Sequence, residues 1–185
     1  MKQAIRDQRE HEILAAALAE LNVKEATQIS MASLAARTGL TRTAIYQYFA
    51  SVDDIFAELV INDMADLVNT LEENVAQFDE PLERVRAWVH SSLEHLSSGE
   101  HAVIRRLSEI NLANEKRGIV RALHGQFMDS LVASVNDMNL ENSQTICAHI
   151  AAVVNSAANR VDLGFDFAYE AQTAESFVMH AIQKN

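Results

Sequence analysis

Apolar residues recur every three to four positions along nearly the whole chain, which is the spacing of one helix face. The first such face carries Ile13, Leu14, Ala17, Leu18 and Leu21. No strand-like alternation of apolar and polar residues runs for a useful length. The pattern therefore predicts an all-α fold of about nine helices: one ending near 21, then 31–38, 41–49, 52–71, 81–98, 101–113, 116–138, 143–163 and 171–183.

Residues typical of helix ends stand at the predicted boundaries. Ser30, Thr41 and Ser51 each precede a helix, where a hydroxyl can accept an otherwise unpaired backbone N–H. Gly39 follows the second helix and accepts the left-handed conformation that ends it. The lone Pro81 suits the first turn of the fifth helix.

Composition narrows the class of protein. Five glycines and one proline among 185 residues are too few for a loop-rich β-sandwich or a low-complexity segment. Cys147 is the single cysteine, so the chain forms no internal disulfide and no cysteine-based zinc site. The first residues lack the apolar core of a secretory signal, and the apolar run Ile13–Ala19 has seven residues, against about 20 for a membrane span. We expect a cytoplasmic protein that makes no membrane contact.

The negative charge is unevenly distributed. The chain has 26 acidic and 15 basic residues, a net charge of −11. Residues 1–60 account for only −2 of it, and residues 61–185 for −9. No Asp or Glu occurs from 26 to 52, a stretch that contains Arg37 and Arg42. An acid-free window inside an acidic protein is a candidate surface for an anion.

Residues 30–46 read as a helix, a glycine-containing turn and a second helix, the arrangement that places the second helix in the major groove of DNA. Leu34, Ala35, Leu40 and Ile45 are expected to pack inward. Because each helical residue turns about 100°, Thr43 and Gln47 then point away from Ile45. The outward face would present hydroxyl, amide, guanidinium, phenol and methyl groups, from Thr43, Gln47, Arg42, Tyr46 and Ala44.

The order of motifs over residues 9–60 resembles the DNA-binding domain of TetR-family transcriptional regulators. The resemblance rests on residues 13–17, 34–41, 45–49 (Ile-Tyr-Gln-Tyr-Phe) and 51–56 (Ser-Val-Asp-Asp-Ile-Phe). It implies a helix-turn-helix domain over 1–50 and an effector-binding and dimerisation domain over 51–185. The DNA contacts it implies are Ser33, Thr41, Arg42, Thr43, Ala44, Tyr46, Gln47 and Tyr48. Specific binding is also expected to draw on backbone N–H groups at helix starts and on Arg6 or Arg9 of the leading segment.

Two positions depart from the family pattern. Val52 stands where the family has a lysine that typically holds a phosphate, and Met31 and Ala32 stand where a polar or basic side chain often reaches DNA. Ser33 is the nearest polar residue. Fewer basic contacts imply weaker non-specific binding and a shallower dependence of affinity on salt.

In the C-terminal region, the resemblance implies a homodimer through the last two helices and a pocket for a small-molecule effector. The small residues of 148–158 would independently permit close helix–helix approach, although packing within one chain explains them equally. Asn155 and Asn159, four positions apart, would line the pocket or bridge the dimer. The residues proposed to line the pocket, each of which could instead be ordinary core or surface, are Trp88, His124, Phe127, Met128, Asn155 and Asn159.

The seven histidines form no metal-binding spacing, and no catalytic motif occurs, so we expect neither a metal nor a cofactor and no enzyme activity. The function predicted is that of a dimeric repressor that binds a palindromic operator through residues 41–49 and is released by a small-molecule effector. The alternative is a helical adaptor that binds a protein partner and retains only vestigial DNA binding, for which Val52 is the main support.

Overall fold

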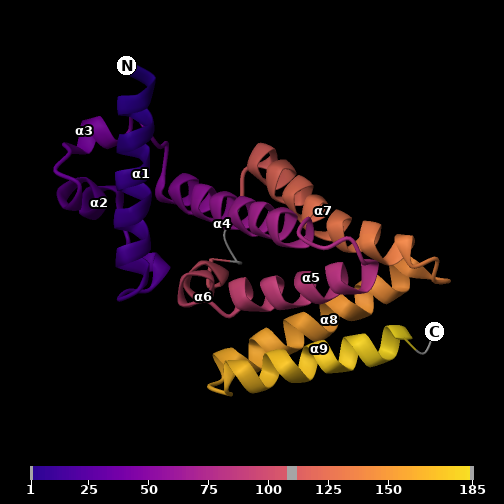
Figure 1. Ribbon diagram of the computed structural model, residues 1–185. Helices are drawn as coiled ribbons and strands as arrows, with labels where there is room; N and C mark the ends of the chain where they lie inside the picture. The colour runs from indigo at the N-terminus through magenta and orange to yellow at the C-terminus, as the bar shows by residue number, and fades with distance from the viewer. Residues whose placement is uncertain (1, 108–111, 184–185) are drawn as a thin grey trace. The chain divides into compact units, whose positions relative to one another are not determined.

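The computed structural model describes residues 2–107 and 112–183 (Figure 1). In this part of the chain every regular element is helical, which confirms the predicted all-α fold. The elements are α1 (Lys2–Leu21), the short 3₁₀ turn η1 (Ala26–Gln28), α2 (Met31–Arg37), α3 (Arg42–Ile45), α4 (Val52–Val75), α5 (Pro81–Leu96), α6 (Gly99–Arg105), α7 (Asn114–Asp137), α8 (Ser143–Asp162) and α9 (Phe167–Gln183).

The helices form two compact units. The first comprises Met1–Asp63 and Val103–Val120, and the second comprises Met64–Ala102 and Arg121–Asn185. Both α4 and α7 therefore begin in the first unit and end in the second. The compact N-terminal unit thus includes the first turns of α7 as well as the helix-turn-helix segment.

The helix-turn-helix packs on a core of its own, in which Ile13, Leu34 and Ile45 are completely buried. The predicted caps are present. The Ser30 hydroxyl accepts the Ser33 N–H at 3.1 Å, and the Thr41 hydroxyl accepts the Ala44 N–H at 3.1 Å. The turn between α2 and α3 passes through Gly39 at a φ of 69°, as expected for a glycine that ends a helix.

The recognition helix α3 is shorter than predicted. It ends at Ile45, whereas the periodicity predicts a helix to residue 49. The N–H groups of Gln47 and Tyr48 bond three residues back, to Ala44 and Ile45, so the chain tightens into 3₁₀-type turns there. This tightening precedes Phe49, which is 5 % exposed in the core.

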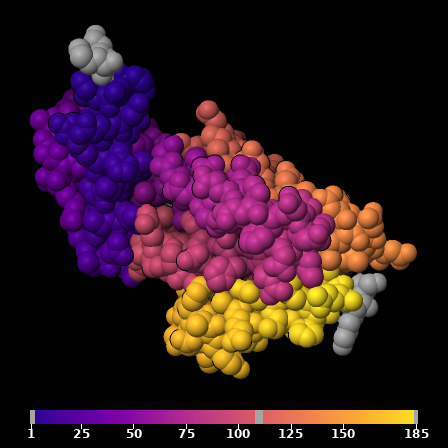
Figure 2. Space-filling view, viewed as in Figure 1, coloured from indigo at the N-terminus to yellow at the C-terminus, as the bar shows by residue number. Residues whose placement is uncertain are grey.

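The second unit has its core between the C-terminal half of α4 and the helices α5, α7, α8 and α9, with Trp88 and Leu131 completely buried. α8 and α9 pack side by side and reverse direction through Gly164 at a φ of 94°. α9 begins at residue 167 rather than at the predicted 171, because the Asp166 carboxylate accepts the Tyr169 N–H and caps the helix. Its side chains form an outer face of this unit (Figure 2).

The sixth helix also differs from its predicted range. α6 begins at Gly99, two residues before the predicted start, and the Ser98 hydroxyl accepts the His101 N–H at 3.1 Å. It ends at Arg105 rather than near residue 113, and residues 108–111 lie outside the described part of the chain. No described helix has both the length and the apolar character needed to cross a membrane.

Candidate nucleic-acid interface

The recognition segment, residues 41–48, presents most of the predicted DNA contacts to solvent. Thr41, Arg42, Thr43 and Gln47 are exposed, and Tyr46 is 53 % exposed. This exposure follows from the burial of the residue between them, Ile45, because neighbouring positions on a helix face away from a buried one. A guanidinium, two hydroxyls, an amide and a phenol are thus available to bases or phosphates.

Two further predicted contacts, Ala44 and Tyr48, are half-buried. The guanidinium of Arg6, on α1, lies 5.8 Å from the centre of the Tyr48 ring, within range of a cation–π interaction. Arg6 also pairs with Glu10 at 2.7 Å. The structure thus places Arg6, a basic side chain of the leading segment, next to the recognition segment. The sequence alone did not distinguish Arg6 from Arg9 in this role.

Ser33 has a structural role in addition to its predicted contact with DNA. Its hydroxyl accepts the Ser30 N–H at 3.2 Å and completes a reciprocal capping box at the start of α2. The same hydroxyl lies 2.9 Å from the Ser30 carbonyl and 3.2 Å from a carboxylate oxygen of Glu20, which is 3 % exposed on α1. Ser33 therefore orients α2, and its contact with DNA remains a prediction.

The acid-free window keeps its positive charges unpaired. Within residues 2–107 and 112–183, no carboxylate pairs with Arg37 or Arg42, and both are exposed. Two acids near the window are neutralised, because Glu20 pairs with Lys24 at 2.9 Å and Asp54 pairs with a lysine of α7 at 2.7 Å, whereas the flanking Glu25 and Asp53 are exposed. A phosphate approaching this surface would meet less repulsion than the net charge of the chain implies.

Val52 has a packing role that accounts for its departure from the family pattern. It is the first residue of α4, half-buried, and packs against the core of the first unit. The cap of α4 is still present, since the Ser51 hydroxyl accepts the Asp54 N–H at 3.0 Å. The helix start therefore keeps its cap although position 52 carries no lysine.

Four of the six proposed effector-binding residues lie near one another in the second unit. Trp88 and Phe127 have ring centroids 4.8 Å apart, and the His124 ring lies 5.9 Å from that of Phe127. Met128 is half-buried against the same core, whereas His124 is exposed. Their assignment to an effector site remains a prediction.

The two asparagines lie elsewhere. Asn155 and Asn159 are exposed on α8, and the Asn155 side-chain amide donates to the Ala151 carbonyl at 2.9 Å. On the neighbouring α9, Tyr169 is 65 % and Phe177 is 63 % exposed. Phe177 borders an apolar cavity of about 90 Å³ between α8 and α9.

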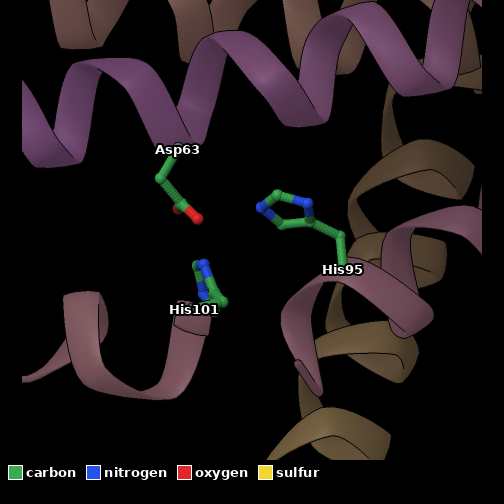
Figure 3. A group of neighbouring side chains, drawn as sticks. All are labelled: Asp63, His95 and His101. Atoms are coloured by element: carbon green, nitrogen blue, oxygen red, sulfur yellow. The ribbon is translucent and has the colours of Figure 1, made fainter. Parts of the chain in front are cut away.

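Sequence spacing did not find the contact between His95 and His101. Their ring centroids lie 5.4 Å apart, because the chain turns at Ser97 and Ser98 between α5 and α6. Figure 3 draws the two rings, which come from α5 and α6, close to each other. The signal for this contact was the Ser-Ser-Gly turn between the helices, since the sequence separation of six alone places the residues on different faces.

A family model matches the N-terminal part of the chain, and solved structures match more than nine tenths of it. The model of the bacterial regulatory proteins of the tetR family matches residues 13–59. The fold is that of FadR from Bacillus subtilis, solved in complex with stearoyl-CoA, with 16% identity, a TM-score of 0.75 and coverage of 91% of this chain and 97% of that chain. No curated protein matches the sequence.

Two regulators named as members of the family share the same fold. PfmR from Thermus thermophilus has 18% identity and a TM-score of 0.74 over 91% of this chain and 97% of that chain. A TetR/AcrR-family regulator from Thermobifida fusca has 17% identity and a TM-score of 0.77 over 93% and 97%. At these identities the structures establish the fold, which includes the C-terminal helices that the family model does not cover.

Proposed function

We propose that this chain, whose residues 13–59 match the model of the tetR family of bacterial regulatory proteins, is a transcriptional repressor that binds a palindromic operator as a homodimer and is released by a small-molecule effector. Members of this family are DNA-binding regulators rather than enzymes. The division of labour proposed is DNA binding by residues 1–50 and effector binding with dimerisation by residues 51–185.

The observation that carries the proposal is the exposed, acid-free recognition segment. Arg42 lies at the N-terminal end of α3, where recognition helices meet base edges, and a guanidinium can hold guanine through two hydrogen bonds. Gln47 can pair with adenine in the same way, and Thr43 can contact a thymine methyl group. Tyr46 and Tyr48 would position the segment through phosphate contacts.

A homodimer is supported by large side chains exposed on α9 and on the turn that precedes it. Leu163, Tyr169 and Phe177 are large apolar or aromatic side chains that are more than 60 % exposed in one chain. Removing such side chains from water stabilises an interface by about 25 cal/mol per Å² of apolar area. A two-fold dimer would also present two recognition helices to the two halves of a palindrome.

The effector site proposed lies at the group formed by Trp88, His124, Phe127 and Met128. The two buried aromatic rings offer an apolar contact surface, and the exposed imidazole of His124 offers a polar group at its edge. The effector would favour a conformation of the dimer in which the two recognition helices no longer match successive major grooves.

The first test is to select binding sites for the purified full-length protein from a random double-stranded DNA library. We expect a palindrome whose half-site centres lie about one turn, or a turn and a half, apart. The recovered site then becomes the probe for an effector screen, in which release of the labelled site identifies an active compound.

Failure to enrich any site would count against the repressor, provided that the protein is folded and dimeric in the selection buffer. That outcome would favour the adaptor, in which the face around α3 binds a protein. The selection is therefore accompanied by circular dichroism and sedimentation measurements on the same preparation, so that an unfolded sample is recognised.

A further inference from the structure

A lysine in the first turn of α7 forms ion pairs and a hydrogen bond with the start of α4. The Lys116 ammonium lies 2.7 Å from the Asp54 carboxylate, 2.8 Å from the Glu58 carboxylate and 3.1 Å from the Asp54 carbonyl oxygen. An ammonium has three N–H donors, and here each has an acceptor. All three residues belong to the first compact unit, although Lys116 is about 60 positions away in sequence.

Asp54, which is paired with Lys116, also forms hydrogen bonds just after the end of the recognition segment. The Asp54 N–H donates to the Ser51 hydroxyl at 3.0 Å, and the Asp54 carboxylate accepts the Ala50 N–H at 3.0 Å. Ala50 directly follows the buried Phe49, the residue at which the recognition segment enters the core. A displacement of Asp54 would therefore reach the backbone that carries Tyr46 to Tyr48.

We propose that Lys116 is a positioning residue for DNA recognition, which holds the recognition segment in its binding orientation by clamping the first turn of α4. This inference rests on the proposed function, since it concerns how the regulator aligns α3. Lys116 itself is not assigned a contact with DNA, because its three donors are already occupied by Asp54 and Glu58.

The electrostatic surroundings favour an intact clamp at neutral pH. Burial alone would raise the pKa of Asp54, but the hydrogen bonds from Lys116 and Ala50 outweigh it, and the pKa lies below its ordinary value. For Lys116, burial alone would lower the pKa. The bonds from its ammonium to Asp54 and Glu58 outweigh burial, and the pKa of Lys116 lies above its ordinary value. From α1, the groups that line the same cavity of about 420 Å³ are Asp7, Glu10 and His11.

The clamp also gives α7 a route to the recognition segment. α7 is one helix that carries Lys116 near its first residue, and it carries Phe127 and Leu131 in the core of the second unit. An effector that repacks the residues around Phe127 would act on the same helix whose first turn carries Lys116. Loss of the clamp would then lower the population of the DNA-binding orientation, without altering any residue that contacts DNA.

The test compares Lys116→Gln, which keeps much of the length of the side chain and removes its charge, with the control Arg117→Gln. Arg117 is the exposed neighbour on α7 and donates to the Leu112 carbonyl outside the clamp. Operator affinity of the full-length protein is measured over a range of salt concentrations on the site selected by the wild type. We expect Lys116→Gln to lose about tenfold in affinity, a typical coupling between sites, while Arg117→Gln retains it.

The salt dependence separates positioning from direct contact. Removing a lysine that binds phosphate makes the slope of log K against log salt less negative by about one. We expect Lys116→Gln to leave this slope unchanged, and a less negative slope would overturn the proposal. Retention of affinity in Lys116→Gln on a site that the wild type binds would also overturn it, whereas a wild type that binds no DNA would refute the repressor itself.

A charge exchange tests whether the ion pair, rather than the fold, sets the affinity. In the double variant Lys116→Glu with Glu58→Lys, the pair is reversed, so we expect affinity to recover relative to Lys116→Glu alone. Thermal unfolding of each variant is recorded in parallel. A double variant that is as stable as the wild type but recovers no affinity would contradict the positioning role.

Discussion

The indole Nε1 of Trp88 donates a hydrogen bond to the main-chain carbonyl oxygen of Phe127 at 3.2 Å, and the centroids of the two rings lie 4.8 Å apart. The indole is completely buried, so this bond satisfies the one polar group that the side chain brings into the core. The contact joins α5 to α7 in the second unit and so connects the proposed effector site to the helix that carries Lys116.

The Trp88–Phe127 contact predicts a graded loss of stability. Trp88→Ala should lower the free energy of unfolding by about 3–5 kcal/mol, because it removes a large buried ring and leaves a cavity. Trp88→Phe keeps an aromatic ring and loses the hydrogen bond, so its cost should be smaller, about 1–3 kcal/mol. Urea denaturation measures both values, and equal costs for the two variants would contradict the packing described.

The two glycines Gly118 and Gly164 should respond to alanine with opposite signs. Gly118 lies inside α7, with no heavy atom within 4 Å of the position that a Cβ would take, so Gly118→Ala should stabilise the protein by about 0.5–1 kcal/mol. Gly164 has a φ of 94°, which an L side chain rarely adopts, so Gly164→Ala should destabilise it by about 1–2 kcal/mol. Thermal unfolding of both variants decides the signs, and a stabilising Gly164→Ala would refute the turn geometry.

The dependence of the free energy of unfolding on pH in acid should reveal the ion pair between Asp54 and Lys116. Because the pKa of Asp54 is lowered by folding, its contribution to stability is complete above its ordinary pKa of 3.8 and is lost as the pH falls through the lower folded value. Asp54→Asn should therefore cost a constant amount from about pH 5 to about pH 8 and progressively less in acid. Urea unfolding at several pH values measures this difference.

The neighbouring Asp53→Asn serves as the control for that titration. Asp53 is exposed in the same first turn of α4, so the two variants remove the same charge from the same helix end. Because no lysine pairs with Asp53 among the described residues, we expect Asp53→Asn to lower the stability less than Asp54→Asn does at neutral pH. Identical pH profiles for the two variants would show that the helix dipole, rather than Lys116, stabilises the ionised Asp54.

The dimer should depend on the exposed face of α9. Phe177→Glu places a charge where the proposed interface is apolar, so we expect a monomer with unchanged helical content and weaker operator binding. Phe78→Glu is the matched control, because Phe78 is 42 % exposed in the link between α4 and α5. Sedimentation equilibrium measures the association, and a Phe177→Glu protein that remains dimeric would place the interface elsewhere.

Local sequence signals predicted most of the fold. Helical periodicity located the helices, and the hydroxyls of Ser30 and Thr41 cap them as expected. The errors occur at helix ends where local bonds compete with the periodic pattern: 3₁₀-type bonds shorten α3 after Ile45, and the Asp166 cap starts α9 early. Periodicity does not distinguish a 3₁₀ turn from the last turn of an α-helix.

The candidate site was predicted where it depends on one helix, and missed where it depends on distant segments. The exposure of Thr43 follows from the position of Ile45 alone, whereas Ala44, also predicted on the outward face, is half-buried. The bond from Lys116 to Asp54 and the contact of His95 with His101 require knowledge of how helices pack, which no spacing within one helix contains. The same holds for Asn155 and Asn159, whose shared face was predicted but not its orientation toward solvent.

The most direct test of the central claim repeats the binding-site selection with Arg42→Ala and Tyr46→Phe. If Arg42 reads a base, Arg42→Ala should bind the wild-type site about 5- to 150-fold more weakly, and its selected palindrome should lose preference at one symmetric pair of positions. Tyr46→Phe should weaken binding without changing the motif, because a phosphate contact carries no sequence information. Full affinity and an unchanged motif in both variants would contradict the assignment of residues 41–48 as the DNA-reading segment.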